Sequence, residues 1–190
     1  MKKIAIFASG TGSNFQAIID AVKAGCLHME VALLVCDKPG ALVIDKAENE
    51  KIKTFVFNPK EFETKVSFEK EIISRLQEND VDLIVLAGYM RLIGTTLLNT
   101  YKNKIINIHP SLLPSFPGKD AIGQAYRAGV KITGVTIHYV DEGMDTGPII
   151  AQRALELSGE ETLAEVGQQI HEIEHAFYPE VLQKYFVEKD

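Results

Sequence analysis

The chain has 190 residues, of which 46% are hydrophobic, and this length and composition are typical of one globular domain with its own core. Its formal net charge of −6 argues against nucleic acid as the main partner. No apolar run reaches the roughly eighteen residues that a membrane-spanning helix needs. The two cysteines, Cys26 and Cys36, lack the spacing of a metal site and favour a reducing cytoplasm.

Apolar runs with the pattern of buried strands alternate with helical patterns along most of the chain. In chain order, strands are predicted at 3–8, 31–36, 53–57, 82–87, 104–108, 132–140 and 149–155. Helices are predicted at 15–24, 41–50, 62–78, 95–102, 121–128 and 162–186. This alternation predicts an α/β fold with a Rossmann-like, mostly parallel sheet flanked by helices. A short loop joins the last two strands, which predicts an antiparallel edge, and a long helix closes the chain.

A glycine-rich turn at 10–14 follows the first predicted strand and opens the first helix. Glycines let the backbone approach a ligand, and a helix N-terminus presents free N–H groups to an anion. Phe15 stands where a dinucleotide fingerprint needs glycine, and no Gly-Lys-Ser/Thr of a P-loop follows, so the turn favours a single phosphate. The alternative is an ordinary tight turn in which Ser13 or Asn14 caps the helix.

The loop 88–94 follows the fourth predicted strand, at the edge of an open α/β sheet where ligands bind. Met90, Leu92 and Ile93 suit the walls of a slot for a flat heterocycle. The guanidinium of Arg91 is suited to bind a carboxylate of the ligand. The alternative is a loop that folds its apolar residues into the core.

Asn107 and His109 are the strongest catalytic candidates. Residues two apart in a strand project to the same side, so both side chains point together from the end of the strand at 104–108. Pro110 restricts the backbone of His109, and the tight loop behind it predicts a cis Leu113–Pro114 bond. A titratable imidazole beside a carboxamide donor suits an oxyanion at a carbonyl. The alternative is that both residues merely end a strand.

The acidic loop 141–147 supplies a partner for His109. Asp145 is expected to approach the imidazole, orient it and stabilise its protonated form. A calcium site is disfavoured because the spacing of an EF-hand is missing. A solvated acidic turn is the plain alternative.

The remaining histidines are expected to be structural or surface residues: His28, His138, His171 and His175. A zinc site on the helical face of His171, Glu174 and His175 lacks a further ligand, and no metal is predicted. No serine or cysteine adjoins His109 in a nucleophile elbow, which favours direct attack by a substrate amine over a covalent acyl-enzyme.

Four segments, 9–14, 107–114, 145–148 and 174–179, give the chain a resemblance to the folate-dependent phosphoribosylglycinamide formyltransferases of purine synthesis. The likeness runs nearly end to end. Its most specific pieces are 107–114, which other 10-formyltetrahydrofolate enzymes share, and the Asp145 loop that follows it. The turn with Ser13 and Asn14 resembles the glycinamide ribonucleotide branch.

The resemblance implies transfer of the formyl group of 10-formyltetrahydrofolate, a co-substrate, to the amine of phosphoribosylglycinamide. It implies one domain over 1–190, with a doubly wound, phosphate-binding half at 1–102 and a catalytic and folate-binding half at 103–190. Asn107, His109 and Asp145 match the catalytic trio. The implied nucleotide contacts are Thr11, Gly12, Ser13 and Asn14 at the 5′-phosphate, Glu174 at the ribose and His171 beside it. The implied folate contacts are Lys65 at the glutamyl tail and, at the pterin, Met90, Arg91, Leu92, Ile93, Asp141, Glu142, Gly143 and Met144.

Such an enzyme is expected in the cytoplasm, as a monomer or weak homodimer with small-molecule substrates and no nucleic acid or membrane partner. The nearest alternative is hydrolysis of formyltetrahydrofolate, but the hydrolases that resemble this core carry an N-terminal regulatory domain, whereas this chain starts on its first strand. Formyl transfer to initiator tRNA calls for an added C-terminal domain and a basic surface. The catalytic trio argues against a non-catalytic folate- or nucleotide-binding regulator, and Phe15 argues against a dinucleotide oxidoreductase.

Overall fold

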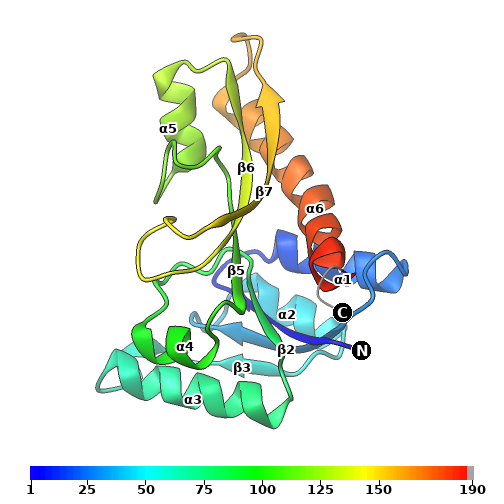
Figure 1. Ribbon diagram of the computed structural model, residues 1–190, viewed down its shortest axis with the longest axis vertical. Helices are drawn as coiled ribbons and strands as arrows, with labels where there is room; N and C mark the ends of the chain where they lie inside the picture. Colours follow the sequence, from blue (N-terminus) through cyan, green and yellow to red (C-terminus); the bar gives the residue numbers. More distant parts are fainter. Residues whose placement is uncertain (188–190) are drawn as a thin grey trace.

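Seven strands form one mixed sheet in the order β3-β2-β1-β4-β5-β6-β7 (Figure 1). The computed structural model describes residues 1–187, so the last three residues of the predicted domain lie outside the described part. The strands are β1 (Lys3–Ala8), β2 (Glu30–Cys36), β3 (Thr54–Val56), β4 (Leu83–Leu86), β5 (Ile105–His109), β6 (Ile132–Tyr139) and β7 (Ile149–Glu156). The first five run parallel, and β6 is antiparallel to both β5 and β7. The predicted fold class, with its late antiparallel edge, is confirmed.

Helices cover both faces of this sheet. They are α1 (Ser13–Lys23), α2 (Leu42–Asn49), α3 (Lys65–Glu78), α4 (Thr95–Thr100), α5 (Ala121–Ala128) and α6 (Leu163–Val187). The helix predicted at 62–78 begins later than expected because Thr64 caps it. Oγ1 of Thr64 accepts a hydrogen bond from the N–H of Ser67 at 3.1 Å, and Oγ of Ser67 accepts one from the N–H of Thr64 at 3.2 Å. The residues before this cap include the short 3-10 turn η1 (Pro59–Glu61).

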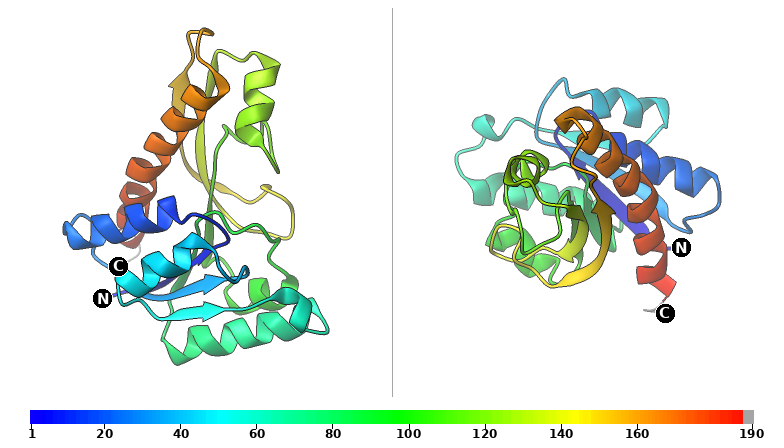
Figure 2. Two further views of the ribbon diagram at one scale, coloured as in Figure 1. Left: turned by 180° about the vertical axis from the view of Figure 1, so that it is seen from behind. Right: turned by 90° about the horizontal axis from the view of Figure 1, so that it is seen from above.

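The alternation of side chains along the strands divides the core between two layers. In β1, Ile4 and Ile6 pack with the layer that includes α1 and α6, whereas Ala5 and Phe7 pack with α3 and α4. Figure 2 shows α6 running beside α1 on the first of these layers. The buried hydroxyl of Tyr178 on α6 lies 2.9 Å from the carbonyl oxygen of Leu86, which ties this long helix to the centre of the sheet.

The register of the central strands determines where ligand-binding loops gather. Phe7 of β1 pairs with Leu86 of β4, and Leu86 pairs with Asn107 of β5. The turn 10–14, the loop 88–94 and the segment after His109 therefore leave the sheet at one common edge, where open α/β sheets bind ligands. Within residues 1–187, no helix is long and apolar enough to cross a membrane.

Candidate active site

His109 ends β5 and is only 5% exposed, with an acceptor facing each of its ring nitrogens. Its Nε2 lies 2.9 Å from the carbonyl oxygen of Phe116, and its Nδ1 lies 3.4 Å from Oδ2 of Asp145. The same Oδ2 accepts a hydrogen bond from the N–H of Gly118 at 2.7 Å. Only an imidazolium, which carries two N–H groups, donates to both acceptors at once. The structure thus brings Asp145 to His109, as the sequence predicts.

Both residues that face the His109 ring have left-handed backbones. The φ angles are 56° at Phe116 and 57° at Asp145. Aspartate adopts this conformation more readily than most residues, whereas for a bulky side chain such as phenylalanine it is rare. Such backbone conformations cluster at functional sites. The Leu113–Pro114 bond in the same loop is cis, which confirms that prediction.

Asn107 shares a face of β5 with His109, and its carboxamide contacts a histidine that sequence reasoning set aside. His138 pairs with Asn107 across the β5–β6 ladder and is 2% exposed, so it is not a surface residue. Its Nε2 lies 3.2 Å from Nδ2 of Asn107, and its Nδ1 lies 2.8 Å from the carbonyl oxygen of Tyr139. This geometry assigns the hydrogen to Nδ1 and leaves Nε2 to accept from Asn107. Burial lowers the pKa of His138, which favours this neutral form.

The turn 10–14 closes onto the N-terminus of α1. Gly12 is the N-cap residue with a left-handed φ of 70°, and no side chain caps the helix, so the alternative of a Ser13 or Asn14 cap is wrong. A Cβ on Gly12 would lie 2.5 Å from Cγ2 of Val43, which explains why glycine is needed. Nζ of Lys46 donates to the carbonyl oxygen of Gly12 at 3.4 Å. The turn therefore combines uncapped N–H groups with a nearby positive charge, a combination suited to an anion.

Asn14, His171 and Glu174 come together behind this turn, although α1 and α6 are distant in sequence. Nδ2 of Asn14 donates to Oε2 of Glu174 at 3.4 Å, and Oδ1 of Asn14 is buried with no hydrogen-bond partner among the described residues. Glu174 is 4% exposed, and Oε2 also accepts from Nδ1 of His171 at 2.8 Å. This hydrogen bond raises the pKa of His171. The cluster thus offers a buried carboxylate and an unpaired acceptor beside the turn.

The loop 88–94 divides its apolar residues between solvent and core. Met90 and Leu92 are 76% and 52% exposed, as expected for residues that wall a binding slot. Ile93 instead folds into the core, as the alternative interpretation of this loop predicts, because its side chain is buried in the layer with α3 and α4. Arg91 finds a carboxylate within the chain: its Nε donates to Oδ2 of Asp37 at 2.6 Å.

Lys65 is exposed at the first turn of α3. One turn further along this helix, the carboxylate of Glu69 accepts a hydrogen bond from the N–H of Gly94 at 2.5 Å. Because Gly94 ends the loop 88–94, the N-terminus of α3 and this loop are held next to one another. The predicted tail-binding lysine therefore lies near the predicted pterin-binding loop.

The loop 141–147 is organised by its own side chains. Oδ1 of Asp141 accepts hydrogen bonds from the N–H of Gly143 at 3.0 Å and from Oγ1 of Thr146 at 2.7 Å. Glu142 and Met144 are exposed. No group of three metal-ligating side chains within residues 1–187 is arranged to hold an ion.

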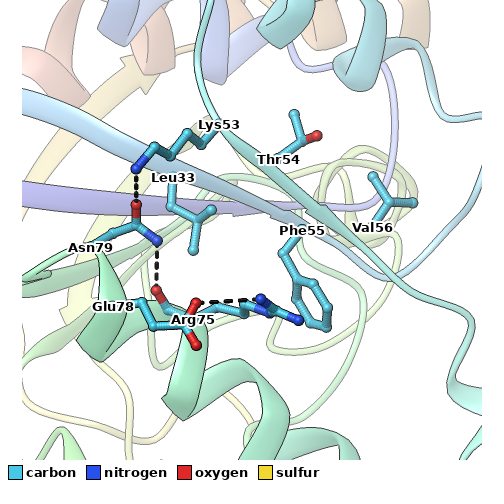
Figure 3. Close-up of a pocket in the computed structure, with 8 residues that line it drawn as sticks. All are labelled: Leu33, Lys53, Thr54, Phe55, Val56, Arg75, Glu78 and Asn79. Carbon is cyan, nitrogen blue, oxygen red and sulfur yellow. Dashed lines mark hydrogen bonds and ion pairs between the residues drawn. The ribbon is translucent and has the colours of Figure 1, made fainter.

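A surface hollow of about 580 Å³ lies away from these segments, beside β3 (Figure 3). Its charged side chains are already engaged. Arg75 pairs with Glu78 at 3.3 Å and its guanidinium lies 5.6 Å from the ring centroid of Phe55, while Nζ of Lys53 donates to Asn79 at 2.8 Å. Since β3 is four strands from β5, roughly 19 Å, this hollow is not part of the candidate site.

Comparison with known proteins decides the family. A family model described as formyl transferase matches residues 2–182. The chain belongs to the formyl transferase family. It is therefore an enzyme that transfers a one-carbon unit.

Individual formyl transferases resemble the chain over almost its whole length. The phosphoribosylglycinamide formyltransferase of Bacillus subtilis (strain 168) is 59% identical over 184 residues, which cover 97% of this chain and 94% of that protein. The crystal structure of a phosphoribosylglycinamide formyltransferase from Bacillus Halodurans, 53% identical, matches 100% of this chain and 97% of its own with a TM-score of 0.96. The crystal structure of glycinamide ribonucleotide transformylase 1 from Geobacillus kaustophilus is 60% identical. It matches 97% of this chain and 98% of its own with a TM-score of 0.95.

Three residues that contact the segments of this candidate site were missed by sequence reasoning: His138, Asp37 and Lys46. Asp37 directly follows β2, and its place at the carboxyl edge of a parallel strand was an available signal. His138 becomes visible only when the register between β5 and β6 is known. Lys46 reaches the turn from α2, and no local pattern indicates that approach.

Proposed function

We propose that this formyl transferase moves the formyl group of 10-formyltetrahydrofolate to the amine of phosphoribosylglycinamide, a step of purine synthesis. One observation carries the proposal: the His109–Asp145 pair lies at the same sheet edge as the uncapped turn before α1. An acyl-transfer site and an anion site are thus adjacent. The activity in the names of the most similar relatives supports the same substrates.

The nucleotide binds at the turn and the cluster behind it. Backbone N–H groups of Thr11, Gly12 and Ser13 donate to the 5′-phosphate, where the positive end of the α1 dipole favours a negative charge. Asn14 contacts the phosphate, and its unpaired Oδ1 is an acceptor suited to a ligand donor. The buried Glu174 carboxylate accepts from the ribose hydroxyls. His171, hydrogen-bonded to Glu174, orients that carboxylate.

The folate binds along the loops 88–94 and 141–147. The exposed side chains of Met90 and Leu92 offer an apolar wall to the pterin, and Met144 offers another from the opposite loop. Backbone groups of both loops read the edge of the ring. The exposed ammonium of Lys65 attracts the carboxylates of the glutamyl tail. The proposed folate contacts are Lys65, Met90, Arg91, Leu92, Asp141, Glu142, Gly143 and Met144, and Ile93 contributes through its backbone alone because its side chain is buried in the core.

The reaction forms a bond between the substrate nitrogen and the formyl carbon and breaks the bond from that carbon to N10 of the folate. The folate supplies the formyl group when it is bound. Asn107 donates a hydrogen bond to the formyl oxygen as negative charge develops on it, and the positive charge of protonated His109 stabilises that charge. Asp145 faces Nδ1 of His109 and stabilises the imidazolium. Asp145 also holds a water that carries the proton from the attacking amine to N10.

The proposal includes the expected location, oligomeric state and co-substrate of the enzyme. It acts on small molecules in the cytoplasm, as a single domain that is a monomer or weak homodimer, with the folate as co-substrate and no resident metal. Light scattering on the purified protein at two concentrations distinguishes a monomer from a weak dimer.

Absorbance of the folate product tests the function directly. The assay uses 10-formyl-5,8-dideazafolate with and without phosphoribosylglycinamide. We expect turnover only when the nucleotide is present. Turnover without it would indicate a hydrolase, and no turnover under either condition, with shifts in melting temperature on ligand addition, would indicate a binding protein.

A further inference from the structure

Asp37 connects the two binding segments of the proposed active site. The residue is 8% exposed, and each oxygen of its carboxylate has a partner. Oδ1 accepts a hydrogen bond from Oγ of Ser9 at 2.5 Å, and Oδ2 accepts one from Nε of Arg91 at 2.6 Å. Ser9 directly precedes the turn 10–14 and Arg91 lies in the loop 88–94, so one buried carboxylate holds both segments.

Ser9 makes a second connection between the same segments. Its Oγ accepts a hydrogen bond from the N–H of Met90 at 3.0 Å, and its own N–H donates to the carbonyl oxygen of Gly88 at 3.1 Å. Because the hydroxyl hydrogen of Ser9 points to Asp37, the lone pairs of the oxygen are left to face Met90. The carboxylate therefore sets the direction of the whole chain of hydrogen bonds.

The far end of the loop 88–94 has a separate anchor. Glu69, which is 2% exposed, accepts hydrogen bonds from the N–H of Gly94 at 2.5 Å and of Leu97 at 3.2 Å. Neither bond reaches the turn 10–14. Glu69 and Asp37 are thus two buried carboxylates that hold opposite ends of one loop, and only Asp37 also holds the turn.

We propose that Asp37 is a positioning residue that sets the turn 10–14 and the loop 88–94 relative to each other for the two substrates. The inference rests on the proposed function, because it takes the turn to bind the nucleotide and the loop to bind the folate. Asp37 acts through Ser9 and Arg91 and contacts neither substrate. A carboxamide in its place removes the negative charge and one acceptor, so both segments lose their common anchor.

Hydrogen exchange of the ligand-free protein, followed by mass spectrometry, tests the anchoring itself. In Asp37→Asn we expect the amides of 88–91 to exchange about tenfold faster, because the N–H of Met90 loses its oriented acceptor. Ser9→Ala should have the same effect while it keeps the Asp37–Arg91 pair, and it replaces the first variant if Asp37→Asn does not fold. Asp80→Asn changes an exposed carboxylate that pairs with Lys3 and should leave these amides unchanged. Wild-type exchange at 88–91 in the folded variants would overturn the inference.

Steady-state kinetics with both substrates tests the positioning. We expect Asp37→Asn to raise the KM of the nucleotide and of the formyl donor about tenfold each, with a smaller change in kcat. Glu69→Gln should raise the KM of the formyl donor alone. Asp80→Asn should change neither the KM of the nucleotide nor that of the formyl donor. The same pattern in Asp37→Asn and Glu69→Gln, or a loss confined to kcat, would overturn the positioning role. If the wild-type protein does not turn over these substrates, the proposed function fails, and the exchange experiment alone decides the anchoring.

Discussion

Asn107 of β5 and His138 of β6 face each other directly across the strand ladder, with Nδ2 and Nε2 3.2 Å apart. Since Nδ1 of His138 donates to the carbonyl oxygen of Tyr139, its Nε2 accepts from one N–H of the carboxamide. That bond fixes the plane of the Asn107 side chain. A carboxamide has a second N–H, which this bond leaves for a substrate oxygen. His138 therefore orients the carboxamide of Asn107, and its Nε2 also lies 3.7 Å from Oδ1 of Asp145.

Replacement of His138 tests this orienting role. We expect His138→Ala to lower kcat about tenfold with little change in either KM, because the carboxamide of Asn107 loses its fixed direction rather than a substrate contact. His138→Gln, whose side-chain oxygen is again an acceptor, should recover part of the loss. His28→Ala removes an exposed histidine and serves as the control. An equal loss in His138→Ala and His138→Gln would contradict the hydrogen-bond explanation.

The proposed trio should carry the largest effects on turnover. We expect Asn107→Ala, His109→Ala and Asp145→Ala each to lower kcat by about 10²–10³, the usual result of losing an oxyanion donor or its support. Asp145→Asn keeps the size of the side chain but removes the negative charge that faces Nδ1 of His109, so it should also lower kcat. Normal turnover in all three alanine variants, with wild-type melting temperatures, would disprove the assignment.

The parts of this site that depend on local periodicity are predictable from sequence. Asn107 and His109 share a face because side chains in any strand repeat every two residues. The register of an antiparallel pair is not local, so nothing in 132–140 alone indicates that His138 lies opposite Asn107. The approach of Asp145 to His109 likewise depends on β6 returning beside β5. Chain order made that approach a reasonable hypothesis, and only the three-dimensional structure gives its distance.

Loops are predicted less well than strands because their apolar residues follow no period. In 88–94, sequence reasoning could not tell that Ile93 enters the core while Met90 and Leu92 stay exposed. It assigned Arg91 to a ligand carboxylate, whereas the structure pairs it with Asp37 at the end of another strand. Both differences arise from contacts between segments that are distant in the sequence.

The pair of His171 and Glu174 predicts a pH-dependent contribution to stability. The hydrogen bond to Glu174 raises the pKa of His171 above its ordinary value of 6.5, so the protonated form is favoured in the folded state. The stabilisation is therefore fully present below pH 6.5 and is lost as the pH rises through the raised value. We expect the difference in melting temperature between the wild type and His171→Gln to be larger at about pH 5.5 than at about pH 8.5. A difference in melting temperature that grows as the pH rises would contradict the assignment.

Two glycines with the same backbone conformation separate strain from crowding at the nucleotide turn. Gly12 and Gly25 have φ angles of 70° and 71°, but a Cβ would lie 2.5 Å from Val43 at Gly12 and within 4 Å of no atom at Gly25 among the described residues. Gly25→Ala should therefore cost only about 1 kcal/mol of unfolding free energy, from the left-handed backbone. Gly12→Ala should cost about 2–4 kcal/mol, because overpacking against Val43 adds to the same strain.

Urea denaturation of both glycine variants measures these costs. Val43→Ala in the Gly12→Ala background removes Cγ2 but keeps Cβ of residue 43, which would lie 2.7 Å from the new Cβ, so it should recover only part of the crowding cost. Gly12→Ala should also raise the KM of the nucleotide, since the N–H groups that bind the phosphate move with the turn. Gly25→Ala should leave that KM unchanged because it lies at the other end of α1. Equal losses of stability in the two variants would mean that Val43 moves aside and that Gly12 is needed only for its φ angle.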